Sequence, residues 1–197
     1  MSNILIIDHR SSIIKELEEA LTQRGYNPET KSYKELSGIK AQDYDAIFSG
    51  GGYTKIKGNN DLENEVFLMY QAEYEKVPFM GICHGAQICS DRLGGHISEI
   101  EPRKGIFKDY EIKEQDPILE GIEIKNLKAF EWHEYGIDSV PDNYEIIITD
   151  STGKIQMARR KGFDFYIVQF HPEAKRPKEK PATNTEPILD NFLKRVS

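Results

Sequence analysis

Short apolar runs alternate with amphipathic stretches along the first half of the chain. Strands are expected at Ile4–Ile7, Asp45–Phe48 and Pro78–Ile82, where turn-forming residues bound each run. Helices are expected between them over Ser11–Leu21 and Leu62–Glu75, because apolar residues recur there at the spacing of one helix face after polar capping residues. This β-α-β-α-β order is typical of a parallel sheet covered by helices.

The second half of the chain is richer in strand patterns. Tyr144–Thr149, Ile155–Arg159 and Phe163–Phe170 alternate or run apolar between turn signals. A helix is expected to begin at or just after Cys83, and another over Pro187–Val196 to close the chain. The pattern predicts an α/β fold with a mostly parallel central sheet, helices on both faces and an antiparallel flank.

Composition places the chain among globular proteins and narrows the choice of partners. Its 197 residues, 38% hydrophobic and 30% charged, can bury a sizeable core as one domain over residues 1–197. The formal net charge of -7 argues against nucleic acid and anionic membranes as partners. No apolar run approaches the roughly 20 residues that cross a bilayer.

The N-terminus and the cysteines predict a cytoplasmic protein. The chain opens into the apolar run Ile4–Ile7 without the basic, apolar and small-residue regions of a signal peptide. Cys83 and Cys89, six residues apart, would lie on different faces of a helix, which disfavours a disulfide between them. This cysteine usage fits a reducing compartment.

The segment Gly81–Gln87 has the pattern of a nucleophile elbow centred on Cys83. The cysteine follows an apolar strand, precedes a helix and is flanked by Gly81 and Gly85, which a tight strand-to-helix turn favours because neighbouring backbones come close. The N-terminus of the helix also favours the thiolate over the thiol. Cys83 is therefore the candidate nucleophile.

The chain has five histidines from which a base could come. His171 follows the apolar run Phe163–Phe170, which would carry it to the carboxyl edge of the sheet, where ligand sites form. Glu173 could fold back to orient its ring, so that base and orienting group come from one turn. His84, adjacent to the nucleophile, is the rival. Ordinary turn, strand or surface roles are expected for the other three: His9, His96 and His133.

An oxyanion hole is expected from backbone amides near the elbow. One candidate is the amide of His84, the residue after the nucleophile. The other is the glycine loop Ser49–Gly52, which leaves a neighbouring strand at the same edge and whose glycines permit φ angles that turn an amide toward a substrate. No Gly-Lys-Ser/Thr follows this loop, so it is not a Walker phosphate loop.

Together these segments resemble those of a class I glutamine amidotransferase. Gly81–Gln87 is similar to the nucleophile segment of that family, His171-Pro172-Glu173 matches its base and orienting segment, and Ser49-Gly50-Gly51 resembles its oxyanion loop, in the same order along nearly the whole chain. The resemblance implies a flavodoxin-like α/β fold and hydrolysis of the glutamine side-chain amide through a γ-glutamyl thioester on Cys83, with no cofactor and no metal.

The resemblance also implies a role for each candidate residue and a partner. The catalytic residues would be Cys83, His171 and Glu173, the oxyanion amides those of Gly51, Gly52 and His84, and the glutamine-binding residues Gln87 and His133. A chain of this length carries no second domain that could use ammonia, so the resemblance implies a separate ammonia-accepting synthase subunit. Its length and glycine loop resemble stand-alone subunits of the GMP synthase kind. The anthranilate, imidazole glycerol phosphate and pyridoxal phosphate pathways use similar subunits, so the sequence leaves the ammonia acceptor open.

Two departures from the family pattern keep other functions open. His84 stands where the family usually has leucine, tyrosine or asparagine, and Gly52-Tyr53 follows glycines where the family often has proline. Cys-His-Gly is instead the elbow of PfpI-type cysteine hydrolases, in which the adjacent histidine is the base. A stand-alone γ-glutamyl hydrolase and a non-catalytic binding protein with the same fold are also compatible with the sequence. The polar segment Lys175–Thr185 is expected to be an exposed loop.

Overall fold

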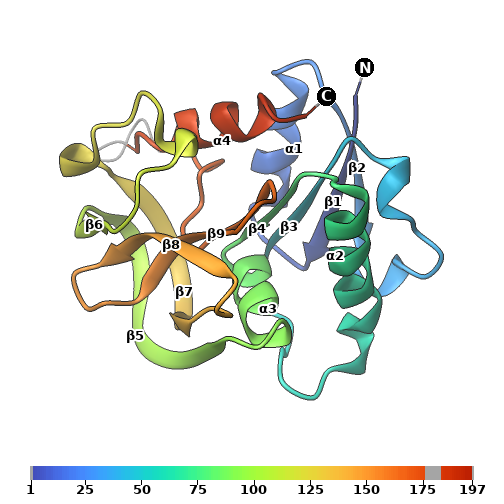
Figure 1. Ribbon diagram of the computed structural model, residues 1–197, viewed down its shortest axis with the longest axis horizontal. Coiled ribbons are helices and arrows are strands. Elements are labelled where there is room, and N and C mark those ends of the chain that lie inside the picture. Colours follow the sequence, from blue (N-terminus) through green and yellow to red (C-terminus); the bar gives the residue numbers. More distant parts are fainter. Residues whose placement is uncertain (1, 176–182, 197) are drawn as a thin grey trace.

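The computed structural model describes residues 2–175 and 183–196, and its centre is one mixed β-sheet. Ten strands form this sheet within the described residues. Half of them run parallel and lie side by side in the middle of the molecule (Figure 1). In spatial order these are β2 (Asn27–Ser32), β1 (Asn3–His9), β3 (Ala46–Gly52), β4 (Phe79–Ile82) and β10 (Phe165–Val168).

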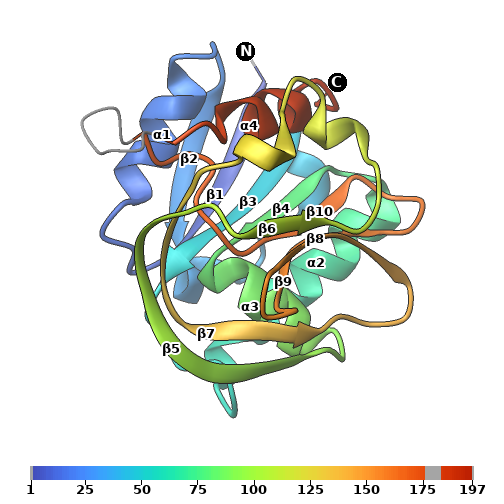
Figure 2. The same ribbon diagram turned by 90° about the vertical axis from the view of Figure 1, so that its left-hand side faces the viewer.

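Antiparallel strands continue the sheet beyond β10. The flank consists of β9 (Ile155–Arg160), β7 (Ala129–Ser139), β5 (His96–Phe107), β8 (Tyr144–Asp150) and β6 (Tyr110–Ile112). The long strands β5 and β7 pair along most of their length and curve together around one side of the molecule (Figure 2). This flank brings β7 beside the carboxyl end of β10, where an isolated bridge joins Phe130 to His171.

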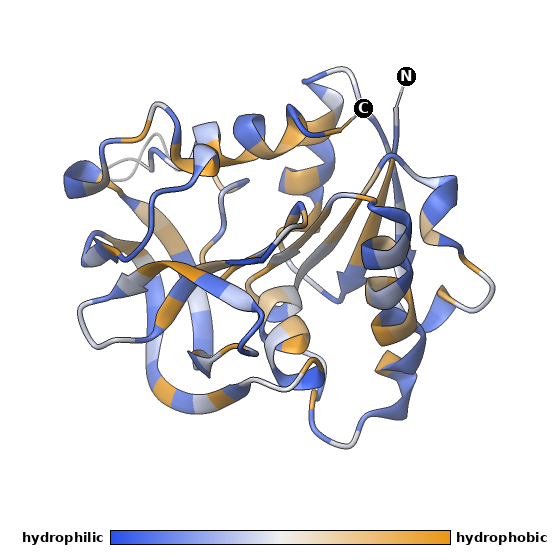
Figure 3. Cartoon of the chain, viewed as in Figure 1, coloured by the Kyte–Doolittle hydropathy of each residue, from blue (hydrophilic) through white to orange (hydrophobic). Residues whose placement is uncertain are grey.

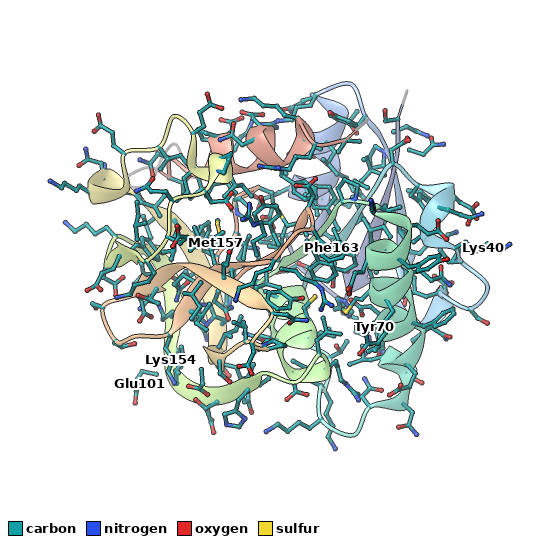
Figure 4. All side chains as sticks on the ribbon, viewed as in Figure 1. Lys40, Tyr70, Glu101, Lys154, Met157 and Phe163 are labelled. Carbon is teal, nitrogen blue, oxygen red and sulfur yellow. The ribbon has the colours of Figure 1, made fainter. Side chains whose placement is uncertain are left out.

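Helices cover both faces of the sheet. The helices α1 (Ile14–Thr22) and α4 (Glu186–Leu193) pack on one face, and α2 (Glu63–Glu75) and α3 (His84–Arg92) on the other. Successive residues of a strand point to opposite faces, so Ile4 and Ile6 of β1 join the first core, and Leu5 and Ile7 the second. Apolar residues accordingly run through the central strands (Figure 3). Met157 lies among interior side chains, whereas Lys40 and Glu101 point outward (Figure 4).

The predicted fold class is confirmed, with differences at individual elements. Helix α1 begins at Ile14, three residues after the predicted cap Ser11, because the Ser11 hydroxyl accepts a bond from the Ile13 amide in a turn before the helix. Strand β3 continues through the glycines to Gly52, so the expected glycine loop is the end of a strand. The edge strand β2 was not predicted, because its residues are mostly polar and carry no strand pattern.

Two further predictions concern the chain ends and membranes. Most of the segment Lys175–Thr185 lies outside the described residues; Lys175 itself is exposed, and Thr185 is buried at the start of α4. In the part of the chain that the structure describes, no helix is long and apolar enough to cross a bilayer.

Candidate active site

Cys83 lies in the tight turn between β4 and α3, in a backbone conformation that side chains rarely adopt. Its φ of 52° and ψ of -104° are unusual for a residue with a Cβ atom, and such conformations cost on the order of 1–3 kcal/mol. The flanking glycines are required by packing. A Cβ atom at Gly81 would lie 3.0 Å from the Ala86 amide nitrogen, and one at Gly85 would collide with the Ser49 carbonyl oxygen. The elbow thus holds a strained, largely buried cysteine at the edge of the sheet.

The helix α3 begins immediately after the cysteine. Its first intrahelical bond runs from the Gln87 amide to the Cys83 carbonyl oxygen at 3.0 Å. The amide of His84 therefore has no partner within the helix, because the first N–H groups of a helix precede any acceptor. The helix dipole adds partial positive charge beside the Cys83 sulfur, which favours the thiolate.

His171 lies at the carboxyl end of β10 and interacts with both Cys83 and Glu173. Its Nδ1 is 2.8 Å from Oε1 of Glu173, and both side chains are almost fully buried. Burial by itself would lower the pKa of His171, but the charges of Cys83 and Glu173 and hydrogen bonds to both outweigh it and raise that pKa well above the usual value. The structure therefore brings together the three residues expected to be catalytic, with the imidazole favoured in its charged form.

The glycines of β3 pack closely against neighbouring segments, for a reason other than the predicted one. None of Gly50, Gly51 and Gly52 has a positive φ, so the backbone freedom of glycine, the predicted reason for them, is not used here. A Cβ atom at Gly51 would instead lie 2.9 Å from Cε1 of His171, and one at Gly52 would collide with the backbone of His9. These glycines are thus needed for close approach, and the conformational argument for them was wrong.

The imidazole of His84 is engaged on the other side of the elbow. Its Nε2 is 2.7 Å from the Thr54 hydroxyl, and its ring meets the ring of His9 edge to face at 5.5 Å. Burial, reinforced by the charge of His9, lowers the pKa of His84 to about 4. This histidine is therefore neutral at pH 7, and its contacts tie the elbow to the chain that follows β3.

Gln87 and His133 meet at one backbone carbonyl of β7. The side-chain nitrogen Nε2 of Gln87 donates to the Tyr135 carbonyl oxygen at 2.8 Å, and Nδ1 of His133 is 2.9 Å from the same oxygen. The other ring nitrogen of His133 is 2.7 Å from Oε2 of Glu131, so both nitrogens are engaged within the protein. The Cys83 sulfur lies 3.7 Å from the neighbouring Trp132 carbonyl oxygen. Strand β7 therefore forms a wall of the site.

A cavity of about 540 Å³ opens onto the cysteine. Its walls include most of the predicted site residues: Gly52, Cys83, His84, Gln87 and His133. Its mouth carries the exposed aromatic side chains of Tyr53, Trp132 and Tyr135 together with several lysines. The volume lies within the range of small-molecule pockets, about 300–1,000 Å³. Among the residues that the structure describes, no cluster of three acidic, histidine or cysteine side chains is arranged to hold a metal ion.

Two buried carboxylates that support the site, Glu65 and Glu131, were not predicted from the sequence. Glu131 is fully buried and accepts from the Arg103 guanidinium, from the Tyr110 hydroxyl at 2.5 Å and from His133. Glu65 is also fully buried and accepts from Ser49 at 2.6 Å. Glu65 lies on the predicted helix Leu62–Glu75, and nothing in its spacing distinguishes it from the other glutamates there. Only Glu131 could have been recognised from the sequence, because it lies two residues before His133.

Comparison with known proteins agrees with this geometry. The profile of the family described as glutamine amidotransferase class-I matches residues 5–194. The chain is 33% identical over 136 residues to the A subunit of glutamine-hydrolyzing GMP synthase from Sulfurisphaera tokodaii, covering 68% of this chain and 70% of that protein. It is 32% identical over 164 residues to the protein of the same name from Pyrococcus abyssi, covering 81% of this chain and 79% of the other.

The fold is also found in solved structures. A glutamine amidotransferase from Thermotoga maritima superimposes with a TM-score of 0.75 at 17% identity, over 98% of this chain and 81% of that one. At this identity the likeness shows a shared fold only. The family profile, by contrast, spans nearly the whole chain, from the first strand to the last helix. The chain therefore belongs to the class I glutamine amidotransferases and is an enzyme of that family.

Proposed function

We propose that this chain hydrolyses the side-chain amide of glutamine through a γ-glutamyl thioester on Cys83 and supplies the ammonia to a partner synthase. The observation that carries the proposal is the buried pair of His171 and Glu173, joined at Nδ1, with the pKa of His171 raised partly by its interaction with Cys83. A thiolate beside an imidazolium is the arrangement that cysteine nucleophiles require. The family membership of the chain supports glutamine as the substrate.

In the first half of the reaction the Cys83 thiolate attacks the side-chain amide carbon of glutamine. The carbonyl π electrons move to oxygen, and the backbone amides of His84 and of Gly51 or Gly52 stabilise the oxyanion. His171 gives its proton to the nitrogen as the carbon–nitrogen bond breaks, so ammonia leaves and the thioester remains. Glu173 holds the ring in orientation and stabilises its charged form.

In the second half water replaces the cysteine. His171, now neutral, takes a proton from water as the water oxygen attacks the thioester carbon. The tetrahedral intermediate collapses, the sulfur leaves as thiolate, and glutamate is released. The cavity beside Cys83 would hold the glutamine, with Gln87 and His133 fixing the Tyr135 carbonyl that lines it.

The relatives support a particular partner. Those described above are named as the A subunits of glutamine-hydrolysing GMP synthase, a name that implies a further subunit. The chain spans at least 70% of each of them. We therefore propose a cytoplasmic complex in which this chain releases ammonia and a GMP synthase subunit uses it. The aromatic and basic mouth of the cavity is exposed and accessible to such a partner.

The test measures glutamate release by the purified chain and its variants. Cys83→Ala is expected to abolish release, and His171→Ala to reduce kcat about 10²-fold or more, as loss of a general base does. His84→Ala is expected to retain most activity, because a base with a pKa of about 4 is too weak to accept a thiol proton at pH 7. Loss of turnover in His84→Ala with full activity in His171→Ala would establish the PfpI-type mechanism instead.

Two further measurements distinguish the glutaminase from a stand-alone hydrolase and from a binding protein. Faster cleavage of γ-glutamyl peptides than of glutamine would identify a stand-alone hydrolase. No turnover of any amide, together with a Cys83 that resists iodoacetamide, would identify a binding protein. Co-purification from native extract, followed by identification of the bound polypeptide, tests the synthase partner. Recovery of a GMP synthase subunit is the expected result, and recovery of a different ammonia-using enzyme would refute that assignment.

A further inference from the structure

A buried polar cluster lies between the glycine end of β3 and the elbow, and the proposed reaction does not use it. We call it the Glu65 cluster, and its members are His9, Ser49, Thr54, Glu65 and His84. Three of its side chains, those of His9, Ser49 and Glu65, have no exposed surface. A buried carboxylate is costly unless donors surround it, so its partners are held in place.

Short contacts connect the members of the cluster. The Ser49 hydroxyl donates to Oε1 of Glu65 at 2.6 Å, and Nε2 of His9 lies 3.2 Å from both the other carboxylate oxygen and the Ser49 hydroxyl. The ring of His9 meets that of His84, whose Nε2 is hydrogen-bonded to Thr54. Glu65 lies in the first turn of α2, where the helix dipole favours a negative charge.

These contacts join the two segments that would supply the oxyanion amides. Ser49 precedes Gly51 by two residues and Thr54 follows Gly52 by two, so the glycines are anchored on both sides. On the elbow, the His84 side chain is held by Thr54, and the backbone amide of the same residue is the second proposed oxyanion donor.

The backbones of the two segments also touch. A Cβ atom at Gly85 would collide with the backbone and hydroxyl of Ser49, and one at Gly52 would collide with His9. The space between the proposed amide donors is therefore set by backbone contacts that the cluster holds together. A shift of the Ser49 backbone would move the glycines relative to the elbow.

We propose that Glu65 is a positioning residue that fixes the separation of the oxyanion amides on β3 and on the elbow. It acts through the Ser49 hydroxyl and through His9, and it does not touch the substrate. This inference rests on the proposed glutaminase function. It also gives the His84 side chain a role, which is to anchor the elbow to Thr54 beside its own amide donor.

The experiment replaces Glu65→Gln in the full chain and compares it with Glu75→Gln. Glutamine keeps the size of the side chain but removes the charge that holds Ser49 and His9. Glu75 lies on the same helix and is exposed, so it controls for the same chemical change in solvent. The measurements are kcat and KM for glutamine, the affinity for glutamate γ-semialdehyde, and the rate of Cys83 alkylation by iodoacetamide.

Each probe reports on a different part of the site. The aldehyde accepts the Cys83 thiolate at its carbon, and the C=O π pair becomes an oxyanion, so its affinity depends on the amide donors. Iodoacetamide loses iodide when the thiolate attacks its methylene carbon, and no oxyanion forms. Its rate therefore reports on the thiolate and His171, and a purely structural role of Glu65 would not separate the two probes.

Glu65→Gln is expected to lower kcat and the affinity for the aldehyde by about 10- to 100-fold, because losing one oxyanion donor entirely costs more than displacing it. KM for glutamine and the rate of alkylation are expected to stay unchanged. Glu75→Gln is expected to stay within about twofold of the unsubstituted chain. Unchanged kcat and aldehyde affinity in Glu65→Gln would overturn the proposal, as would an equal loss in alkylation.

Two further outcomes remain interpretable. If Glu65→Gln does not fold, Ser49→Ala removes the connecting hydroxyl and is expected to show the same separation between aldehyde affinity and alkylation. Equal behaviour of both probes in Ser49→Ala would then refute the positioning role. Failure of the unsubstituted chain to hydrolyse glutamine would instead refute the proposed function, which separates that failure from a failure of this inference.

Discussion

The substitution His84→Gln is expected to reduce the loss of folding stability at acidic pH. Burial and the charge of His9 lower the pKa of His84 to about 4 from the ordinary 6.5. In the unfolded chain this histidine binds a proton as the pH falls below 6.5, whereas in the folded chain it stays neutral until the pH nears 4. The part of the free energy of unfolding that depends on neutral His84 is therefore fully present above pH 6.5. It is lost progressively as the pH falls toward 4.

The size of this loss follows from the two pKa values. Proton linkage gives a loss of about 2 kcal/mol at pH 5 and about 3 kcal/mol at pH 4, relative to pH 7.5. Glutamine cannot take up a proton, so the His84→Gln variant lacks this loss. The free-energy difference between the two proteins should therefore change by that amount in favour of the variant.

Urea unfolding between pH 7.5 and pH 5 measures the effect. Carboxylates that titrate in this range contribute to both proteins, so the difference between them isolates the histidine. His96→Gln is the matched control for the same substitution in solvent, because 60% of the His96 side chain is exposed. Equal loss of stability in the unsubstituted protein and in His84→Gln would show that His84 is not held neutral, and the argument against it as a base would fail.

Three other changes test the packing of the site. Gly51→Ala should reduce glutamate release at least about 10²-fold at an unchanged fold by circular dichroism, because its Cβ would lie 2.9 Å from Cε1 of His171; full activity would refute the close approach. Cys83→Gly should have a free energy of unfolding about 1 kcal/mol higher than that of Cys83→Ala in urea titrations, because only glycine relieves the strain of a φ of 52°. The reverse order would contradict the strain. Glu131→Gln should lower the free energy of unfolding by about 3 kcal/mol, because a buried ion pair loses one partner. The exposed Glu134→Gln should cost under about 1 kcal/mol, and similar losses in both would refute the argument from burial.

Local patterns were sufficient to locate the candidate catalytic residues. Cys83 between its glycines, and His171 with Glu173 two residues on, are short segments whose local geometry follows from neighbouring residues. A turn from strand to helix and an imidazole held by a nearby carboxylate both form over a few residues. The structure accordingly brings these three residues together.

Contacts between distant segments decided what the other candidates do. His84 was the rival base because it is next to Cys83 in sequence, but its ring bonds Thr54, thirty residues away. No local spacing encodes that pairing. His133 was expected to reach the substrate, yet its nitrogens are engaged by two near neighbours on β7, Glu131 and the Tyr135 carbonyl. Only the tertiary structure brings Gln87, 48 residues from Tyr135, to the same carbonyl oxygen.

By itself, the sequence determined the alternating central strands and helices, the nucleophile segment and the base segment, because periodicity and turn chemistry act over a few neighbouring residues. The strands β2, β5, β6 and β7 were not predicted individually. Only the tertiary structure decided that Gly51 is needed for close approach to His171 and that Glu65 meets Ser49. Those contacts arise when strands and helices pack on one another. A buried carboxylate is recognisable as such only when the side chains around it have excluded water.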